Sequence, residues 1–333
     1  MTYLGTLCLV LLTTAFAGSI SRKIGMPAVI GQLLVGIILG PAMLGWVTNN
    51  NFVHIFSEIG VVILMFMAGL ESDLDLLKKY LKPATSVALF GVIAPIILVY
   101  LLGRIYNFTN EEAIFLGVTF AATSVSISVE VLKELKKLDT KEGTTILGAA
   151  VIDDILAVLI LSILVSIFSD VAKAEGGHTQ SNLGVGILIQ VIYFIGIYLV
   201  FRWIAPFLMK ISEKLLISSS EILMSLVICL GMAFFADLVG LSAVVGSFFA
   251  GVAVAQTPYK REIDSSIEPI GYAVFIPMFF VSIGLSMTFK GLLTNWLFIV
   301  ILLVLALLTK WGGCGLGAKM LGMSWHSGDI IGA

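Results

Sequence analysis

Two stretches of twelve residues, GMPAVIGQLLVG at residues 25–36 and GLSAVVGSFFAG at residues 240–251, decide the fold of this 333-residue chain. They share Gly, Ala, Val, Gly and Gly at matching positions, with an offset of 215 residues. The same offset relates Gly69-Leu70 to Gly284-Leu285, so the match extends without a gap across two neighbouring apolar segments. Self-similarity at a fixed offset indicates an internal structural repeat.

The rest of the chain consists of long apolar segments. Hydrophobic residues make up 59% of the sequence and charged residues 12%, whereas soluble domains carry about 25% charged residues. Most segments are about 20 residues long, the length that a helix needs to cross the hydrocarbon core of a bilayer. The sequence therefore predicts an all-α polytopic membrane protein with eleven complete spans, at residues 3–19, 27–47, 52–70, 84–103, 113–132, 144–168, 183–209, 222–236, 241–256, 270–289 and 296–321.

The repeat predicts how these spans are organised. It pairs span 2 with span 9 and span 3 with span 10, and a displacement of seven spans places the two copies in opposite orientations. Such inverted-topology repeats are common in secondary transporters. We expect a single transmembrane domain, 1–333, with a first copy at 1–168 (spans 1–6), a linker span within 169–220 and a second, truncated copy at 221–333. The copy of span 6 would end about 50 residues beyond Ala333, giving about 13 spans in full length.

Basic residues sort between alternate connections, which predicts the orientation. Of the 19 Lys and Arg residues, fourteen lie in the connections after odd-numbered spans and three in the others. By the positive-inside rule, the connection that contains Lys133, Lys136, Lys137 and Lys141 faces the cytoplasm and the N-terminus lies outside the plasma membrane. No basic region precedes the first apolar run, so we expect this run to remain as span 1 and not to be a cleaved signal peptide.

Composition excludes several classes of function. The formal net charge is −2, and the sequence contains no basic aromatic patch and no Gly-x-x-x-x-Gly-Lys loop. Nucleic acid and nucleotides are therefore not expected as partners, and no cofactor is expected. The three cysteines, Cys8, Cys229 and Cys314, lie in apolar runs, where we interpret them as packing residues.

Three charged residues lie far inside spans. Asp153 and Asp154 occupy the middle of span 6, within GAAVIDDILAV, and Lys310 occupies the middle of span 11. An aspartate at the centre of a bilayer costs about 2.5–3.5 kcal/mol on insertion scales, so an adjacent pair indicates a function. Neighbouring helical residues point about 100° apart. One carboxylate can thus pair with Lys310 while the other faces a water-filled cavity, although a purely structural ion pair would explain one aspartate.

Hydroxyl residues crowd the middle of span 5, in TFAATSVSISV at residues 119–129. A helix broken there would place Thr123, Ser124 and Ser126 beside the aspartates, together with backbone carbonyl groups. Such oxygen ligands suit Na+ or Li+. Close packing of small residues is the competing explanation for each position. Glu58, Glu130, Glu134 and Asp237 lie near span ends and are expected to be solvated.

Five segments together resemble the monovalent cation:proton antiporter-2 family, most closely its short NapA-type sodium/proton antiporters. They are GMPAVIGQLLVGIILGP, TFAATSVSISVEVLKEL, GAAVIDDILAV, FFVSIGLSM and, after Lys310, GLGAKMLG. The resemblance implies that Asp154 binds Na+ and that Asp153 forms a salt bridge with Lys310 that breaks when the ion binds. It also implies a homodimer, two crossed broken helices, and exchange of two protons per Na+, which is electrogenic and serves pH and sodium homeostasis.

The mechanism expected from these features is alternating access. A mobile core of spans 4–6 and 11–13 would move against a dimerisation scaffold of spans 1–3 and 8–10, and Na+ (or Li+ or K+) would compete with protons for the same carboxylates. Alternatives are a glutathione-gated potassium efflux system, which shares this type of membrane domain, and an intramembrane protease. The sequence lacks a Gly-x-Gly-Asp motif and a mid-span histidine, so an enzyme is not expected.

Overall fold

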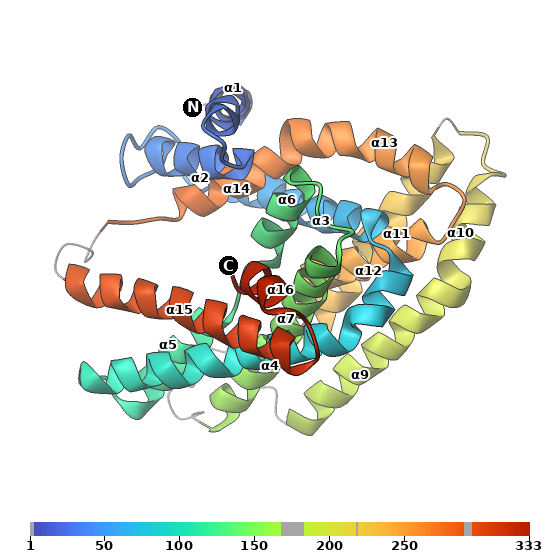
Figure 1. Ribbon diagram of the computed structural model, residues 1–333. Coiled ribbons are helices and arrows are strands. Elements are labelled where there is room, and N and C mark those ends of the chain that lie inside the picture. Colours follow the sequence, from blue (N-terminus) through green and yellow to red (C-terminus); the bar gives the residue numbers. More distant parts are fainter. Residues whose placement is uncertain (1–2, 168–182, 218, 290–294) are drawn as a thin grey trace.

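The computed structural model describes residues 3–167, 183–217, 219–289 and 295–333, and in this part of the chain all regular structure is helical (Figure 1). The elements are α1 (Tyr3–Lys23), α2 (Ala28–Leu39), α3 (Asn51–Glu71), α4 (Leu74–Ile105), α5 (Asn110–Ala121), α6 (Val125–Glu134), α7 (Lys141–Ile167), α9 (Leu183–Leu199), the π-helix η1 (Val200–Ile204), α10 (Ala205–Ser212), α11 (Ser220–Leu238), α12 (Ala243–Ala255), α13 (Lys260–Ile270), the π-helix η2 (Gly271–Phe275), α14 (Ile276–Leu285), α15 (Trp296–Met320) and α16 (Trp325–Gly332).

Each of the eleven predicted spans contains a helical segment, although the span predicted at 27–47 is helical only to Leu39, the end of α2. Among the described residues, nine helical segments are long and apolar enough to cross a membrane, and α2 and α12 are shorter apolar helices of 12 and 13 residues. The prediction of an all-α polytopic membrane protein is therefore confirmed. The predicted boundary between the first repeat and the linker falls within residues 168–182, outside the described residues, and the domain division remains a prediction.

Two predicted spans begin too late. α4 starts at Leu74 and not at residue 84, because Asp73 caps the helix by accepting hydrogen bonds from the backbone N–H groups of Asp75 and Leu76. The span predicted at 270–289 is the end of a longer helical segment, α13, η2 and α14, that starts at Lys260. α13 is amphipathic and buries only one face, which includes Ile263 and Ile267, so its mean hydropathy is too low to indicate a span.

Residues that the 215-residue offset relates make equivalent helix contacts in the two copies of the repeat. Gly36 of α2 lies against the Val281 carbonyl of α14, and its counterpart Gly251 of α12 lies against the Phe66 carbonyl of α3. Residues 66 and 281 are themselves 215 positions apart, so one backbone contact occurs twice. In both places an added Cβ would collide with the carbonyl oxygen. Glycine is therefore required for the close approach of these helices.

Alanine at Gly36 is expected to destabilise the protein, because the backbone of α14 must move away to accommodate the methyl group. The expected loss is about 1–3 kcal/mol, typical of overpacking. Gly231→Ala in α11 is the matched control, since no atom of the described residues outside the neighbouring helix backbone lies within 4 Å of its added Cβ, and alanine there favours the helix by about 1 kcal/mol. Thermal unfolding in detergent should separate the two variants; equal melting temperatures would contradict the packing argument.

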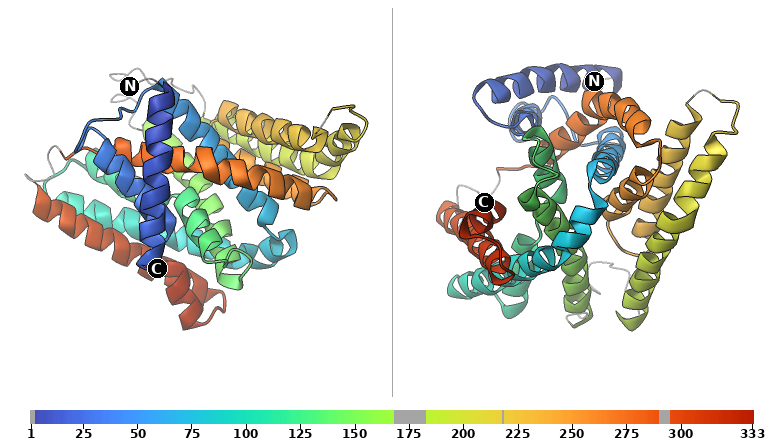
Figure 2. Two further views of the ribbon diagram at one scale, coloured as in Figure 1. Left: turned by 90° about the horizontal axis from the view of Figure 1, so that it is seen from above. Right: turned by 45° about the vertical axis from the view of Figure 1, so that its right-hand side comes forward.

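The described helices pack mainly in two groups, which Figures 1 and 2 show on opposite sides of α6. The core group contains α4, α5, α6, α7, α15 and α16. The scaffold group contains α1, α2, α3, α11, α12, α13, η2 and α14, with α9, η1 and α10 packed along it. α6 belongs to the core group through α7 and also contacts α2 and α3 of the scaffold group. Its position makes it the main contact between the groups.

Candidate ion site

α7 and α15 bring together two charges that are 157 residues apart in sequence. The Lys310 Nζ atom lies 3.0 Å from Oδ2 of Asp153, and the side chains are 18% and 7% exposed. Each charge compensates the cost of burying the other. The structure thus places the predicted pair in contact, in the middle of two apolar helices.

The predicted break in span 5 lies beside this pair. α5 ends at Ala121 and α6 begins at Val125. Ser124 caps α6 by accepting a hydrogen bond from the N–H of Ile127, and Thr123 Oγ1 donates to Asp153 Oδ2 over 3.2 Å. The ends of the two half-helices leave backbone groups without intrahelical partners. Ser126 is buried in the first turn of α6.

The two oxygens of Asp153 differ in their surroundings. Oδ2 accepts hydrogen bonds from both Lys310 and Thr123, whereas Oδ1 is buried with no hydrogen-bond partner among the described residues. A buried acceptor without a partner is costly, and in native structures it usually marks a strained or functional position. This oxygen is therefore available to a proton or to a cation.

Asp154, the next residue of α7, is partly buried. It lies near the hydroxyl of Ser242 in the scaffold group. Ser242 also caps α12, where it accepts from the N–H of Val244. The two adjacent carboxylates thus have different surroundings: Asp153 is paired with Lys310 within the core group, and Asp154 lies near Ser242 of the scaffold group.

Two residues near the site were not identified from the sequence. Ser242 is one, although it occupies the repeat position of Pro27 and could have been singled out as the polar member of that pair. Gly91 of α4 is the other: a Cβ there would lie 2.8 Å from Cys314 Sγ and 3.7 Å from Lys310 Nζ. Gly91 thus provides space for the lysine side chain, and nothing in its apolar sequence context indicates this.

The expectation that all four span-end carboxylates are solvated is wrong for two of them. Glu58, with a 67% exposed side chain, and Asp237 are exposed as expected. Glu130 is only 4% exposed, and Glu134 has a 15% exposed side chain. The reason is tertiary: the end of α6 is covered by the scaffold group, which the local sequence does not reveal.

An intramembrane lysine–aspartate pair beside an interrupted helix, in a polytopic helical protein, is characteristic of ion-coupled secondary transporters. Residues 9–333 match the family described as "sodium/hydrogen exchanger, transmembrane", and the chain belongs to this family. The resemblance to cation:proton antiporters is thereby confirmed.

Several known proteins are similar over almost the whole chain. The Na(+)/H(+) antiporter of Enterococcus hirae is 54% identical, with 100% of this chain and 86% of that protein covered. The Na(+)/H(+)-K(+) antiporter GerN of Bacillus cereus is 43% identical over 98% of this chain and 82% of its own length. The solved sodium proton antiporter MjNhaP1 of Methanocaldococcus jannaschii, at 17% identity, has the same fold, with a TM-score of 0.61 over 98% of this chain and 81% of that chain.

Proposed function

We propose that this protein is a secondary active antiporter, not an enzyme, that exchanges Na+ for H+ across the plasma membrane. The observation that carries the proposal is the Lys310–Asp153 ion pair in mid-membrane, beside the break between α5 and α6 and next to a second carboxylate, Asp154. The relatives named as Na(+)/H(+) antiporters support it. Because one of them is named for K+ as well, K+ and Li+ are included among the candidate cations.

The chemistry follows from competition for the same oxygens. Asp154 binds Na+ or a proton, and the Thr123 hydroxyl, the free Oδ1 of Asp153 and carbonyl groups at the break in span 5 are hard oxygen ligands that suit Na+. When the cation binds, the Lys310–Asp153 pair opens and protons leave. The titration belongs to the three coupled groups together and not to one residue.

Transport proceeds by alternating access, with the core group moving against the scaffold group. We further propose two protons per Na+, a homodimer, an outward N-terminus and no cofactor other than the transported ions. These follow from the family resemblance and the distribution of basic residues. The apolar cluster that joins Val125, Val129 and Val151 of the core group to α3 and α12 supplies an apolar surface along which the two groups can move.

The direct test is reconstitution of the protein in liposomes that contain a pH-sensitive dye. Addition of Na+, Li+ or K+ outside should drive protons out of the vesicles and raise the internal pH, and the order of the responses ranks the cations. A membrane potential set by valinomycin and K+ should change the rate of Na+ exchange if the exchange is electrogenic. Absence of a pH change with every cation would refute the antiporter proposal.

Ser242→Ala should weaken cation binding without abolishing exchange. A hydrogen bond to a charged group contributes about 1.5–3 kcal/mol, so we expect the half-saturating Na+ concentration to change by about tenfold. Ser247→Ala is the matched control, because Ser247 is buried in the same helix and its hydroxyl donates to the Val244 carbonyl of its own helix. An unchanged half-saturating concentration in Ser242→Ala would exclude a role for this hydroxyl.

A further inference from the structure

The last turn of α6 attaches the core group to the scaffold group through three side chains. Glu130, Lys133 and Glu134 lie at positions i, i+3 and i+4, which share one face of a helix. The ion-site chemistry uses none of the three. All three contact scaffold residues: Glu130 and Lys133 contact η2 and α3, and Glu134 contacts α1 and α2.

The contacts of Glu130 and Lys133 form one buried network. Tyr272 of η2 donates its hydroxyl hydrogen bond to Glu130 over 3.0 Å. The Lys133 Nζ atom lies 2.7 Å from Oε1 of Glu71, at the end of α3, and 5.2 Å from the centre of the Tyr272 ring. The Lys133 side chain is 7% exposed and that of Glu71 is 27% exposed, so this ion pair is largely shielded from water.

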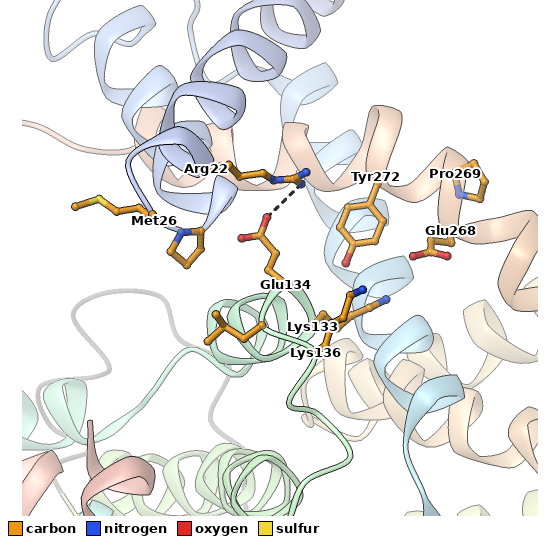
Figure 3. A pocket seen from close by; sticks show the side chains of 11 residues that line it. Arg22, Met26, Lys133, Glu134, Lys136, Glu268, Pro269 and Tyr272 are labelled. Atoms are coloured by element: carbon orange, nitrogen blue, oxygen red, sulfur yellow. Dashed lines mark hydrogen bonds and ion pairs between the residues drawn. The ribbon is translucent and has the colours of Figure 1, made fainter.

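Glu134 binds the start of α2. Its carboxylate accepts a hydrogen bond of 2.7 Å from the Ala28 N–H and lies 3.4 Å from the Arg22 guanidinium (Figure 3). The N-cap residue of α2 is Pro27, which has no side chain that could cap the helix. Glu134 therefore supplies from the core group the anionic cap that the helix N-terminus favours.

A core carboxylate also lies near the start of the corresponding helix in the other copy of the repeat. The counterpart of α2 is α12, which is capped by its own residue Ser242, and Asp154 lies near Ser242. In both copies a core carboxylate thus lies near the start of the corresponding scaffold helix. At the start of α2 this carboxylate is Glu134, and near the start of α12 it is the ion-binding candidate Asp154.

α6 links the two positions mechanically. At 10 residues and 1.5 Å per residue it is about 15 Å long. Its first turn is next to Thr123, which binds Asp153, and its last turn carries the three scaffold contacts. A movement of α6 at the ion site is therefore transmitted to Glu130, Lys133 and Glu134.

We propose that the last turn of α6 is an interdomain lock, in which Glu130, Lys133 and Glu134 hold the core group on the scaffold group and separate from it in every exchange cycle. This inference rests on the proposed alternating access. The lock lies on the side of the 133–141 connection, beside a cavity of about 740 Å³. Arg22, Lys133, Glu134 and Tyr272 line that cavity, which lies between α6 and the scaffold (Figure 3).

Covalent closure of the lock tests the inference. In a background without native cysteines, Arg22→Cys and Glu134→Cys are joined by a short bis-methanethiosulfonate reagent, and Na+/H+ exchange is measured before and after cross-linking and after reduction. Exchange should fall by about tenfold or more and should return on reduction. The matched control joins Asn49→Cys to Ser286→Cys, whose native side chains are 3.1 Å apart within the scaffold group, and should retain its rate.

An unchanged rate in the fully cross-linked Arg22/Glu134 pair would overturn the lock. If that pair is inactive even when reduced, the charge exchange of Lys133→Glu with Glu71→Lys provides the test. Each substitution alone should slow Na+/H+ exchange, and the double variant should recover most of the lost rate. No recovery would also overturn the lock. Absence of exchange in the unmodified protein would instead refute the proposed function, so the two failures are distinguishable.

Discussion

Asp154→Asn should abolish cation-driven proton movement while the protein stays folded. Asparagine keeps the volume of the side chain, but it neither releases a proton nor neutralises a bound cation. Removing one partner of a buried charge interaction costs about 2–5 kcal/mol, and at about 1.4 kcal/mol per tenfold this corresponds to a loss of cation affinity of 30-fold or more. The measurement is Na+-driven pH change in liposomes at matched protein content.

A control variant and a stability measurement are needed to interpret the loss of exchange in Asp154→Asn. Asp237→Asn removes an exposed aspartate in α11 and should leave exchange unchanged. The apparent melting temperature of Asp154→Asn in detergent should equal or exceed that of the unmodified protein, because a mid-membrane carboxylate is removed. Asp154→Asn with normal, pH-dependent exchange would exclude Asp154 as the ion-binding residue.

Most of the fold is predictable from two sequence properties. Apolar length indicates the spans, and the offset of 215 residues indicates which helices have equivalent contacts, as the paired glycine contacts of α2 with α14 and of α12 with α3 show. Both the apolar length and the offset can be read directly from the order of residues in the sequence. α13 was missed because its buried residues alternate with charged ones, so that its mean hydropathy falls below that of a span.

The site is predictable only where a residue is anomalous in its local context. Asp153, Asp154 and Lys310 stand out because charge in mid-span is costly. Ser242, Glu130 and Glu134 do not stand out, since a serine or glutamate near a span end is ordinary in sequence. Their roles arise from contacts more than 80 residues away along the chain, which no local pattern encodes.

Lys310→Met should destabilise the protein by about 3–5 kcal/mol, because it leaves the Asp153 carboxylate buried without its counter-charge. Asp153→Asn should have a comparable effect by leaving the ammonium group unpaired. The double variant should return to within about 1 kcal/mol of the unmodified protein, since it removes both charges and keeps the Thr123 contact. Lys319→Met, at the end of α15 near Trp325, controls for the loss of a lysine from the same helix.

In the double variant, the effect on stability and the effect on exchange should differ. If Lys310 and Asp153 serve mainly to hold α7 to α15, the double variant recovers both melting temperature and exchange. If the pair opens in each cycle to couple proton release to cation binding, the double variant recovers melting temperature alone, and exchange by all three variants stays strongly reduced. We expect the second result, because replacing a buried ion pair by neutral groups is often neutral or stabilising, so stability alone gives little reason to keep two charges in the middle of a membrane.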